Sequence, residues 1–538
     1  MFTHAIQIDY CITLLGILQK DTEDTVSKRE SILLTGVIAS WVIIIAYISL
    51  SRSYFGFGTE TDYLGAFFIE AQRLLSGEPL TLDFHPPFYA AVLALFQFFL
   101  DDWFLTGRIV SLVSYSIALV TSFHFFKQLA GKTAGWGALF ALMASSVFVY
   151  FSTLATSDVF FYALYSTTLL MALLAYNKNS LAFWGTCGVL IGIVILSRSN
   201  GFTLLALLLL PWISNHNTQD KLKASGILFI GILFPLLTWA GIANYWGSPF
   251  MPAGNYINLA LTYFPPGTDR LTGDARVVVE SQFHSLWQVL SYDPMHMLET
   301  YFRDLIKLIQ HLLFSDQLIG LPIYFALIPG VALLLLKVDR VIVFYICILT
   351  LSQALLINLK FFEARYFLFL VPLYGVALAI CFEKFFEQVK INILPNMENN
   401  TKAIAITALI AFLPAASSIN NAINNTKSTD LKLDESVTQL RGQLKKDSWI
   451  VARKPHMAFY NNGKFSTLPN VNSYSELNTK LAEFDKNTTV YVYFGLIEAK
   501  TRPQFKELIS GNIEKAPWLS PLISSNKPDQ WVLYKYTN

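Results

Sequence analysis

The stretch Thr59–Tyr89, TETDYLGAFFIEAQRLLSGEPLTLDFHPPFY, follows the first long apolar run of the chain. Two carboxylates, Glu60 and Asp62, stand one position apart near its start, and a helical run then leads to a His-Pro-Pro-Phe-Tyr turn. Charged side chains beside a membrane span are costly and usually functional. The stretch therefore predicts a catalytic site at the outer face of a bilayer.

The composition is that of a polytopic membrane protein with room for one soluble domain. Of 538 residues, 54% are hydrophobic, 15% are aromatic and only 14% are charged. Soluble domains have about 25% charged residues. The formal net charge is +2, and no basic run of the kind that follows a phosphate backbone is present. We therefore expect no nucleic-acid partner.

The cysteines and the N-terminus exclude two further classes. Each of the four cysteines lies in or beside an apolar run, and no CxxC or HxH spacing occurs, so neither a disulfide framework nor a zinc site is expected. The run Ala5–Leu18 contains Asp9 and lacks a basic leader and a small-residue cleavage site. We therefore expect the first spanning helix, not a cleavable peptide, to direct insertion. The cysteines are Cys11, Cys187, Cys347 and Cys381.

Eleven apolar runs are candidates for membrane-spanning helices, since a span needs roughly 20 apolar residues. One further run, 86–100, is short and begins with two prolines. Whether that run crosses the bilayer decides the topology of everything after it. The eleven candidates are 32–50, 107–126, 134–152, 159–176, 181–197, 199–214, 225–246, 317–336, 340–358, 366–383 and 402–419.

The distribution of lysine and arginine favours a topology in which 86–100 does not cross. Cytoplasmic loops carry an excess of these residues. If 86–100 is a surface or re-entrant helix within a first outer loop, 51–106, the basic loops are cytoplasmic. The large loop 247–315 and the C-terminal tail then lie outside. We therefore expect a multi-pass protein of the plasma (inner) membrane. The basic residues concerned are Lys20, Lys28, Arg29, Lys127, Lys132, Lys178, Lys221, Lys223, Lys337, Arg340, Lys384 and Lys390.

Two parts outside the spans have patterns of their own. The part 281–314 of the large outer loop is amphipathic at helical spacing, which suits a helix in the membrane interface or one packed on the protein's own outer domain. After Ile419 the composition becomes polar, and the tail shows two helical and three strand-like runs. We expect a transmembrane domain, 1–420, and a small α/β domain, 421–538. The predicted helices are 433–446 and 474–484, and the predicted strands are 449–452, 489–494 and 531–536.

Plain structural roles compete with catalytic ones at each polar position near the outer face. Thr59 and Asp62 match a capping box, in which Asp62 would only begin a helix over 62–75. Asp158, with Ser157, could cap a helix over 159–176. Arg198 and Arg365 could be cations that snorkel to the interface. A histidine before two prolines, as at His85, is commonly a turn residue.

An ordered set of motifs runs along most of the chain. After the acidic pair come Tyr63, a helix, Gly77 and the turn His85–Tyr89. The later motifs are LATSD (154–158), SRSNG (197–201), FEARY (362–366) with Pro372, and RKPH (453–456) with Tyr460. The set resembles the GT-C class of membrane glycosyltransferases, most closely the branch of protein O-mannosyltransferases and the aminoarabinose transferase of lipid A. Its first motif departs from the usual Asp-Glu form, because here it is Glu-x-Asp.

The resemblance implies a mainly α fold, a transmembrane bundle of about 11 spans with a small C-terminal α/β domain. It implies transfer of a sugar from a polyprenyl phosphate to an acceptor outside the cytoplasm. Such transfer needs a carboxylate base and cations for the leaving phosphate. The expected base is Asp62 or Glu60, and Asp158 would orient the acceptor or bind a metal. The expected phosphate ligands are Arg365, Arg198 and Lys360, and the site-lining residues are Tyr63, His85 and Tyr89.

Several points stay open on the sequence alone. The sugar is unknown, and the acceptor is a protein, a lipid or a glycan. A divalent metal would need Glu60, Asp62 and Asp158 to converge, and the class differs in its need for one. The partners expected are the lipid-linked donor, that acceptor and membrane lipids. The alternative function is a transporter or flippase of lipid-linked sugars, which would carry paired charges inside its spans.

Overall fold

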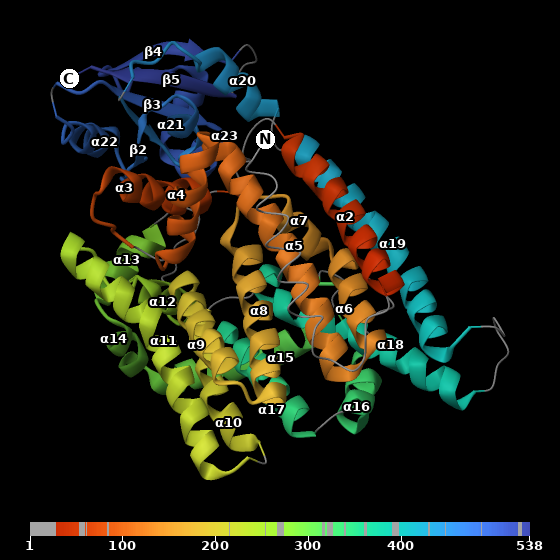
Figure 1. The fold of residues 1–538 in the computed structure, drawn as a ribbon. Coiled ribbons are helices and arrows are strands. Elements are labelled where there is room, and N and C mark those ends of the chain that lie inside the picture. Colours follow the sequence, from red (N-terminus) through yellow and green to blue (C-terminus); the bar gives the residue numbers. More distant parts are fainter. Residues whose placement is uncertain are drawn as a thin grey trace.

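The computed structural model shows a helical membrane bundle with a small α/β domain at one end (Figure 1). The structure describes residues 28–52, 60, 62–82, 85–214, 216–252, 254–265, 274–314, 318–319, 326–337, 340–359, 363–389, 397–428, 431–446, 448–485, 487–525 and 530–537.

Six of the described helices are long and apolar enough to cross a membrane. A helix of roughly 20 Å is too short to cross the hydrocarbon region, and each of the six is much longer than that. A seventh span is formed if the helix pair Lys132–Ala144 (α6) and Ser146–Ser152 (α7), bent by 67°, counts as one. The six are α2 (Lys28–Leu50), α5 (Trp103–Ala130), α8 (Ser157–Lys178), α11 (Thr218–Trp246), the joined η5 and α18 (Ala364–Gln388) and α19 (Asn399–Ser428).

The prediction of eleven straight spans is therefore only partly confirmed. The predicted span 134–152 breaks at Ser145, whose hydroxyl accepts a hydrogen bond from the Phe148 amide and caps α7. The predicted span 199–214 is mostly a 3₁₀ helix, η2 (Ser199–Leu209), followed by a single turn, α10 (Leu210–Ile213). Three other predicted spans correspond to helices that are shorter than the six. These are α9 (Leu181–Ser197), α16 (Leu327–Lys337) and α17 (Arg340–Asn358).

Small residues bring the central helices into close contact. A Cβ built on Gly137 of α6 would lie 2.4 Å from the carbonyl oxygen of Gly375 in α18, and one on Gly188 of α9 would lie 2.2 Å from that of Leu228 in α11. Such spacing leaves no room for a larger side chain. Close backbone approach at small residues is the usual packing mode of membrane helices, because lipid provides no hydrophobic driving force between them.

The first outer loop forms short helices above the bundle. A π-helix, η1 (Tyr63–Phe67), continues into α3 (Phe68–Ser76), which ends at Gly77 in the left-handed conformation, φ 69°. The helix α4 (Phe88–Leu100) has 13 residues, about 20 Å, so it is too short to cross the hydrocarbon region. Its placement on the membrane surface stays a prediction.

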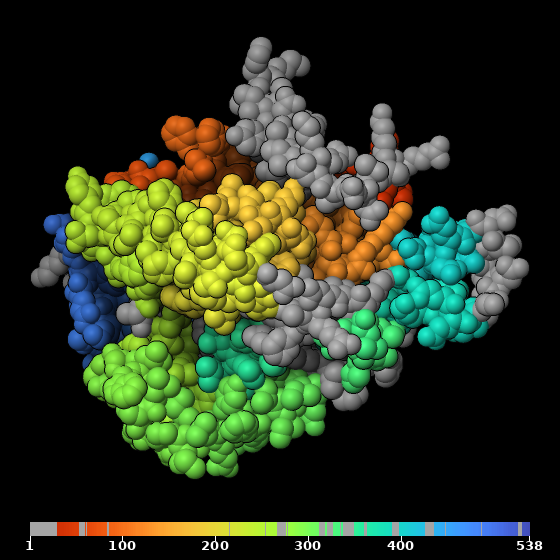
Figure 2. Space-filling model, turned by 60° about the horizontal axis from the view of Figure 1, so that its bottom comes forward, coloured from red at the N-terminus to blue at the C-terminus, as the bar shows by residue number. Residues whose placement is uncertain are grey.

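The large outer loop contains four helices, which Figure 2 shows in green beside α11. In the longest, α15, the side chains of Met297 and Leu308 are buried, whereas Phe302 and Ile306 on another face are exposed. One face thus packs on the protein and an apolar face remains uncovered, so the two alternatives for this amphipathic segment are compatible. The helices are α12 (Asn255–Tyr263), α13 (Asp274–Gln282), α14 (Leu286–Tyr292) and α15 (Pro294–Phe314).

The C-terminal domain is a five-stranded mixed sheet in the order β2-β1-β3-β5-β4. The predicted strands correspond to β1 (Trp449–Ala452), β3 (Val490–Gly495) and β5 (Trp531–Tyr536), which occupy the centre. The edge strands β2 (Lys464–Thr467) and β4 (Leu519–Ser524) were not predicted. Helices α20 (Leu431–Leu440), α21 (His456–Tyr460), α22 (Tyr474–Leu481), α23 (Leu496–Thr501) and the 3₁₀ helix η6 (Pro503–Ser510) complete the domain.

Candidate active site

Glu60 anchors the first outer loop in the bundle. Its Oε1 lies 2.5 Å from Nη2 of Arg108 in α5, and neither side chain is exposed. The same oxygen accepts a hydrogen bond of 2.8 Å from the Ala155 amide, and Arg108 also donates to the carbonyl of Thr153. Glu60 therefore ties the loop to α5 and to the α7–α8 connection.

Asp158 lies in the first turn of α8 and is almost completely buried. It forms an ion pair with Arg198, which follows α9, and accepts a hydrogen bond of 2.6 Å from the Thr156 hydroxyl. The N-cap of α8 is Thr156, whose side chain accepts from the Asp158 amide. The alternative that Asp158 and Ser157 cap this helix is therefore wrong.

Arg365 connects three acidic side chains. It lies in η5 (Ala364–Leu370), and its Nη1 is 3.7 Å from Oδ2 of Asp158 and 3.9 Å from Oδ2 of Asp62. Its Nε is 2.5 Å from Oε2 of Glu363. The centre of the Tyr366 ring is 5.1 Å from the Arg365 guanidinium and 5.2 Å from that of Arg198. The two arginines are thus fixed by carboxylates and by one shared aromatic ring.

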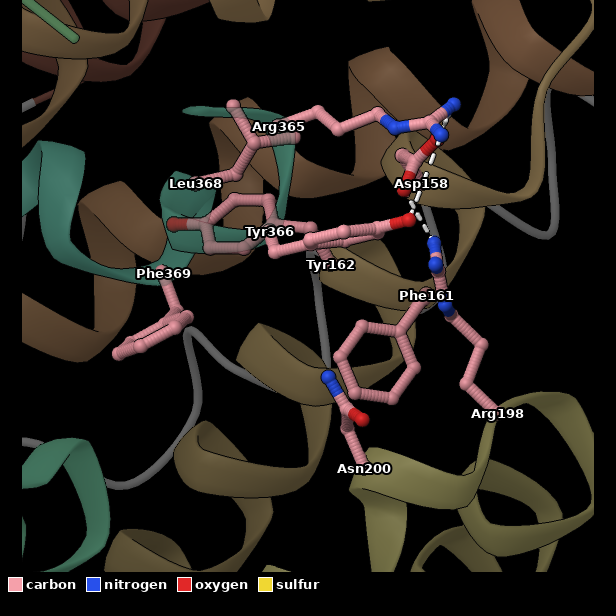
Figure 3. Close-up of a pocket in the computed structure, with 9 residues that line it drawn as sticks. All are labelled: Asp158, Phe161, Tyr162, Arg198, Asn200, Arg365, Tyr366, Leu368 and Phe369. Carbon is pink, nitrogen blue, oxygen red and sulfur yellow. Dashed lines mark hydrogen bonds and ion pairs between the residues drawn. The ribbon is translucent and has the colours of Figure 1, made fainter. Parts of the chain in front are cut away.

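A small pocket lies between these groups. Figure 3 shows the two guanidinium groups on either side of Asp158, with the aromatic rings to one side of them. Cations on one wall and aromatic side chains on the other can hold an anionic head group joined to an apolar chain. The pocket is lined by Asp158, Phe161, Tyr162, Arg198, Asn200, Arg365, Tyr366, Leu368 and Phe369.

Asp62 is the accessible carboxylate of the group. Its side chain is 56% exposed, against 4% for Asp158. It stands at the start of η1 and makes no side-chain cap hydrogen bond as the N-cap of that helix, whereas the capping box with Thr59 is not tested. Thr59 lies outside the described residues. An exposed carboxylate beside a buried cation can accept a proton from a bound molecule.

His85 and Tyr89 both pack against Phe67 of η1. The His85 ring lies 4.4 Å from that of Phe67, and Tyr89 meets Phe67 edge-on at 4.8 Å. Burial lowers the pKa of His85 to about 4, while Asp62 raises it and Arg198 lowers it. The imidazole is therefore neutral near pH 7. Burial also raises the pKa of Tyr89 above its ordinary value, so its hydroxyl stays protonated.

Tyr63 has a packing role in addition to its place beside Asp62. Its hydroxyl donates a hydrogen bond of 2.5 Å to the Trp103 carbonyl, and its ring is fully buried. A Cβ on Gly107 would lie 2.7 Å from this ring. Burial raises the pKa of the Tyr63 phenol well above its ordinary value, so the group is a neutral donor.

The structure thus brings together most of the residues predicted for the site. Asp62, Asp158, Arg198 and Arg365 converge, and the charges of all four affect the pKa of His85. Glu60 pairs with Arg108 and is enclosed. Lys360 lies outside the described residues, so its predicted role is not tested.

Sequence reasoning missed Arg108, Glu363 and Tyr366. Arg108 was hidden at the start of an apolar run, although a lone arginine there signals a buried partner. Glu363 and Tyr366 stand in the FEARY segment itself, next to the predicted Arg365. The sequence showed that both residues stand beside Arg365, but their contacts with the two arginines depend on the fold.

The acidic residues do not form a ready-made metal centre. Among the residues that the structure describes, no group of three His, Cys, Asp or Glu side chains is placed to hold a metal ion. Glu60 faces Arg108, and Asp158 faces two arginines. We therefore derive no step through a metal.

Comparison with known proteins relates this geometry to a class. Residues 84–242 match the family model described as dolichyl-phosphate-mannose-protein mannosyltransferase. The structure of ArnT from Cupriavidus metallidurans in the apo state matches with a TM-score of 0.58 at 12% identity, covering 93% of this chain and 97% of that one. The chain has the fold of the GT-C glycosyltransferases. The resemblance inferred from the sequence is thereby confirmed.

Further GT-C structures show the same fold. ArnT bound to undecaprenyl phosphate matches with a TM-score of 0.52 at 12% identity, covering 93% of this chain and 98% of that one. The Archaeoglobus fulgidus oligosaccharyltransferase AglB, in complex with an inhibitory peptide and a dolichol-phosphate, matches with 0.55 at 12%, covering 92% and 73%. Among curated proteins, none matches the chain significantly in sequence.

Proposed function

We propose that this GT-C protein transfers a sugar from a polyprenyl-phosphate donor to an acceptor at the extracytoplasmic face of the plasma (inner) membrane. The observation that carries the proposal is the convergence of an exposed carboxylate, Asp62, with two partly buried arginines around Asp158 at one pocket. The three parts match the needs of glycosyl transfer, which are a base, an anion site and an enclosed space.

The arginines supply the anion site for the donor. Arg198 and Arg365 flank the pocket, and guanidinium groups bind phosphate in a bidentate way and stay charged. Each arginine already has a carboxylate partner, so the pair is held in place before a ligand binds. Two solved structures of the same fold contain undecaprenyl phosphate or dolichol-phosphate, which supports this class of donor.

Asp62 is the proposed general base, in preference to Glu60. Glu60 is enclosed and neutralised by Arg108, whereas Asp62 is accessible. In the proposed reaction the acceptor hydroxyl or amide gives its proton to Asp62. The acceptor atom bonds to the anomeric carbon while the bond from that carbon to the phosphate oxygen breaks. The phosphate leaves with the electron pair, and the arginines stabilise its charge.

Asp158 and His85 have supporting roles in this scheme. Asp158 lies between the two guanidinium groups and limits their movement. Neutral His85 lies beside Asp62 and can bind a sugar hydroxyl without adding charge. Asp158 therefore acts on the donor side and His85 lines the space for the sugar.

The opposite ends of the bundle support the extracytoplasmic placement. The candidate site lies where α8 begins and α9 ends, at the end that carries the C-terminal domain in Figure 1. At the other end Glu30 lies 3.5 Å from Lys127 and 3.7 Å from Lys132. Basic residues at one end and the site at the other suit a cytoplasmic and an outer face. Nucleotide sugars are generally unavailable outside.

The positions of the charged residues support a glycosyltransferase better than a transporter. In the described spans, the ion pairs of the site lie at helix ends, at Asp158, Arg198 and Arg365, where a surface reaction needs them. A transporter would place paired charges near the bilayer midplane. A sugar-transfer assay separates the two functions, since a flippase moves the lipid-linked sugar without forming a new glycosidic bond.

The test is a transfer assay on folded protein with a polyprenyl-phosphate sugar. Asp62→Asn should lower turnover by about 10²–10⁴-fold, the usual contribution of a general base. Glu78→Gln, an exposed carboxylate of the same loop, is the matched control and should keep wild-type turnover. Wild-type turnover by Asp62→Asn would remove Asp62 from the mechanism.

A further inference from the structure

The C-terminal domain touches the helix that begins at Asp62. The side chain of Pro455 lies 3.7 Å from the Cβ position of Gly65 in η1. Phe459, in α21, meets Phe68 edge-on with ring centres 5.0 Å apart. These contacts join the turn after β1 to the first outer loop, and Figure 1 shows the domain directly above α3 and α4.

A buried carboxylate fixes the shape of that turn. Oε1 of Glu498 accepts a hydrogen bond of 2.8 Å from the Arg453 amide, and Oε2 accepts one of 3.0 Å from the Gly495 amide. Glu498 is only 2% exposed. The backbone from Arg453 to Pro455 therefore has one defined position against Gly65, because a buried carboxylate without its donors would be costly.

Lys454 stands at the tip of the turn, between the residue held by Glu498 and the residue packed on Gly65. It is partly buried, and its charge interacts with Asp62 and Glu498. Other lysines of the domain, such as Lys464 and Lys506, are exposed. Burial and the neighbouring Arg453 lower the pKa of Lys454, whereas Asp62 and Glu498 raise it.

We infer that the C-terminal domain is part of the active site, and that Lys454 is a positioning residue for Asp62. The inference rests on the proposed role of Asp62 as base. Arg365 lies 3.9 Å from the Asp62 carboxylate on the bundle side, and on the domain side Lys454 directly precedes Pro455, which packs on Gly65 three residues after Asp62. In this arrangement, cations from two different elements orient the carboxylate toward the pocket.

A disulfide trap tests the docking without any activity. In a cysteine-free background, the pair Gly65→Cys and Pro455→Cys should form a disulfide under mild oxidation, because the two side chains adjoin. The control pairs Gly65→Cys with Leu522→Cys, an exposed residue of β4. That strand lies three strands from β1, about 14 Å across the sheet, so this pair should stay reduced. Equal trapping of both pairs, or of neither, would overturn the docking.

A pH profile tests the role of the charge. Removing a cation beside a carboxylate favours its protonated form. Lys454→Met should therefore move the acid limb of kcat/KM to higher pH, with activity recovered at alkaline pH, whereas Lys454→Arg should restore the limb. Lys506→Met, an exposed cation of the same domain, should leave the profile unchanged.

The outcomes separate this inference from the proposed function. An unmoved acid limb in an active Lys454→Met enzyme would overturn the inference and leave the glycosyltransferase proposal intact. A pH-independent loss in Lys454→Met that Lys454→Arg does not restore would also overturn it, because that indicates a structural role. If wild-type protein transfers no sugar from a lipid-linked donor, the proposed function fails, and the disulfide pair still decides the docking.

Discussion

Glu60 Oε1 lies 2.5 Å from Arg108 Nη2, and both side chains are completely enclosed. The pair fixes Glu60 in the bundle, so Asp62 is the accessible carboxylate of the two. A buried ion pair adds little net stability over an apolar pair of the same shape, but breaking it exposes the full cost of the charge that remains. The pair therefore fixes where the loop begins.

We predict that Glu60→Gln destabilises the protein by about 3–5 kcal/mol, the usual cost of leaving a buried charge unpaired. Thermal unfolding of the purified protein in detergent measures this. Combining Glu60→Gln with Arg108→Met should cost less than the sum of the two single changes, because the double variant leaves neither charge alone. Additive losses would contradict the pairing, and Glu78→Gln serves as the exposed control.

Arg365→Ala should lower kcat/KM by about 10²–10³-fold, since removing one donor to developing negative charge has effects of that size. Part of the loss should appear as a higher KM for the donor. Arg365→Lys should recover little of it, because lysine lacks the planar fork that meets Glu363 and the Tyr366 ring. Arg303→Ala, an exposed arginine of α15, is the control and should behave as wild type.

His85 should make the protein less stable in mild acid. Its pKa is about 4 in the folded protein and 6.5 in the unfolded chain, so only the unfolded state binds the proton between these values. Stability therefore falls as the pH drops from about 6.5 to 4, by as much as about 3 kcal/mol. Unfolding measured across this window should show a smaller decline for His85→Gln than for wild type, and equal declines would contradict the prediction.

Much of the fold and of the site was predictable because it depends on local pattern. Long apolar runs gave the positions of α2, α5 and α8 to within a few residues, since lipid accepts little else. The convergence of Asp158 and Arg198 followed from placing both at the same end of alternating helices. The central strands of the C-terminal domain were also found, because their apolar runs fill both faces of the sheet.

What the sequence missed depends on tertiary contacts or on weak local signals. The edge strand β4 contains Pro521, which argues against a strand anywhere but at an edge. The bend at Ser145 and the 3₁₀ helix after Arg198 interrupt runs that look continuous in hydropathy. The contact between Pro455 and Gly65 joins residues 390 positions apart (455 minus 65), and no local pattern encodes it.

The topology prediction can be tested with single cysteines in a cysteine-free background. Lys506→Cys, exposed on the C-terminal domain, should react with a membrane-impermeant maleimide added from outside to intact cells. Lys223→Cys, exposed at the opposite end of the bundle in α11, should react only after the membrane is opened. The reverse pattern would place the site in the cytoplasm and remove the main argument against a nucleotide-sugar donor.

The central claim is that a polyprenyl-phosphate donor binds between Arg198 and Arg365, within reach of Asp62. The most direct measurement is an experimental density map of the purified protein with added polyprenyl phosphate. We expect density for one phosphate at the Arg365 guanidinium, with the prenyl chain between helices. Arg365→Ala should lack that density under the same conditions. Phosphate density elsewhere with this pocket empty, or sugar transfer from a UDP- or GDP-sugar without any lipid carrier, would contradict the account.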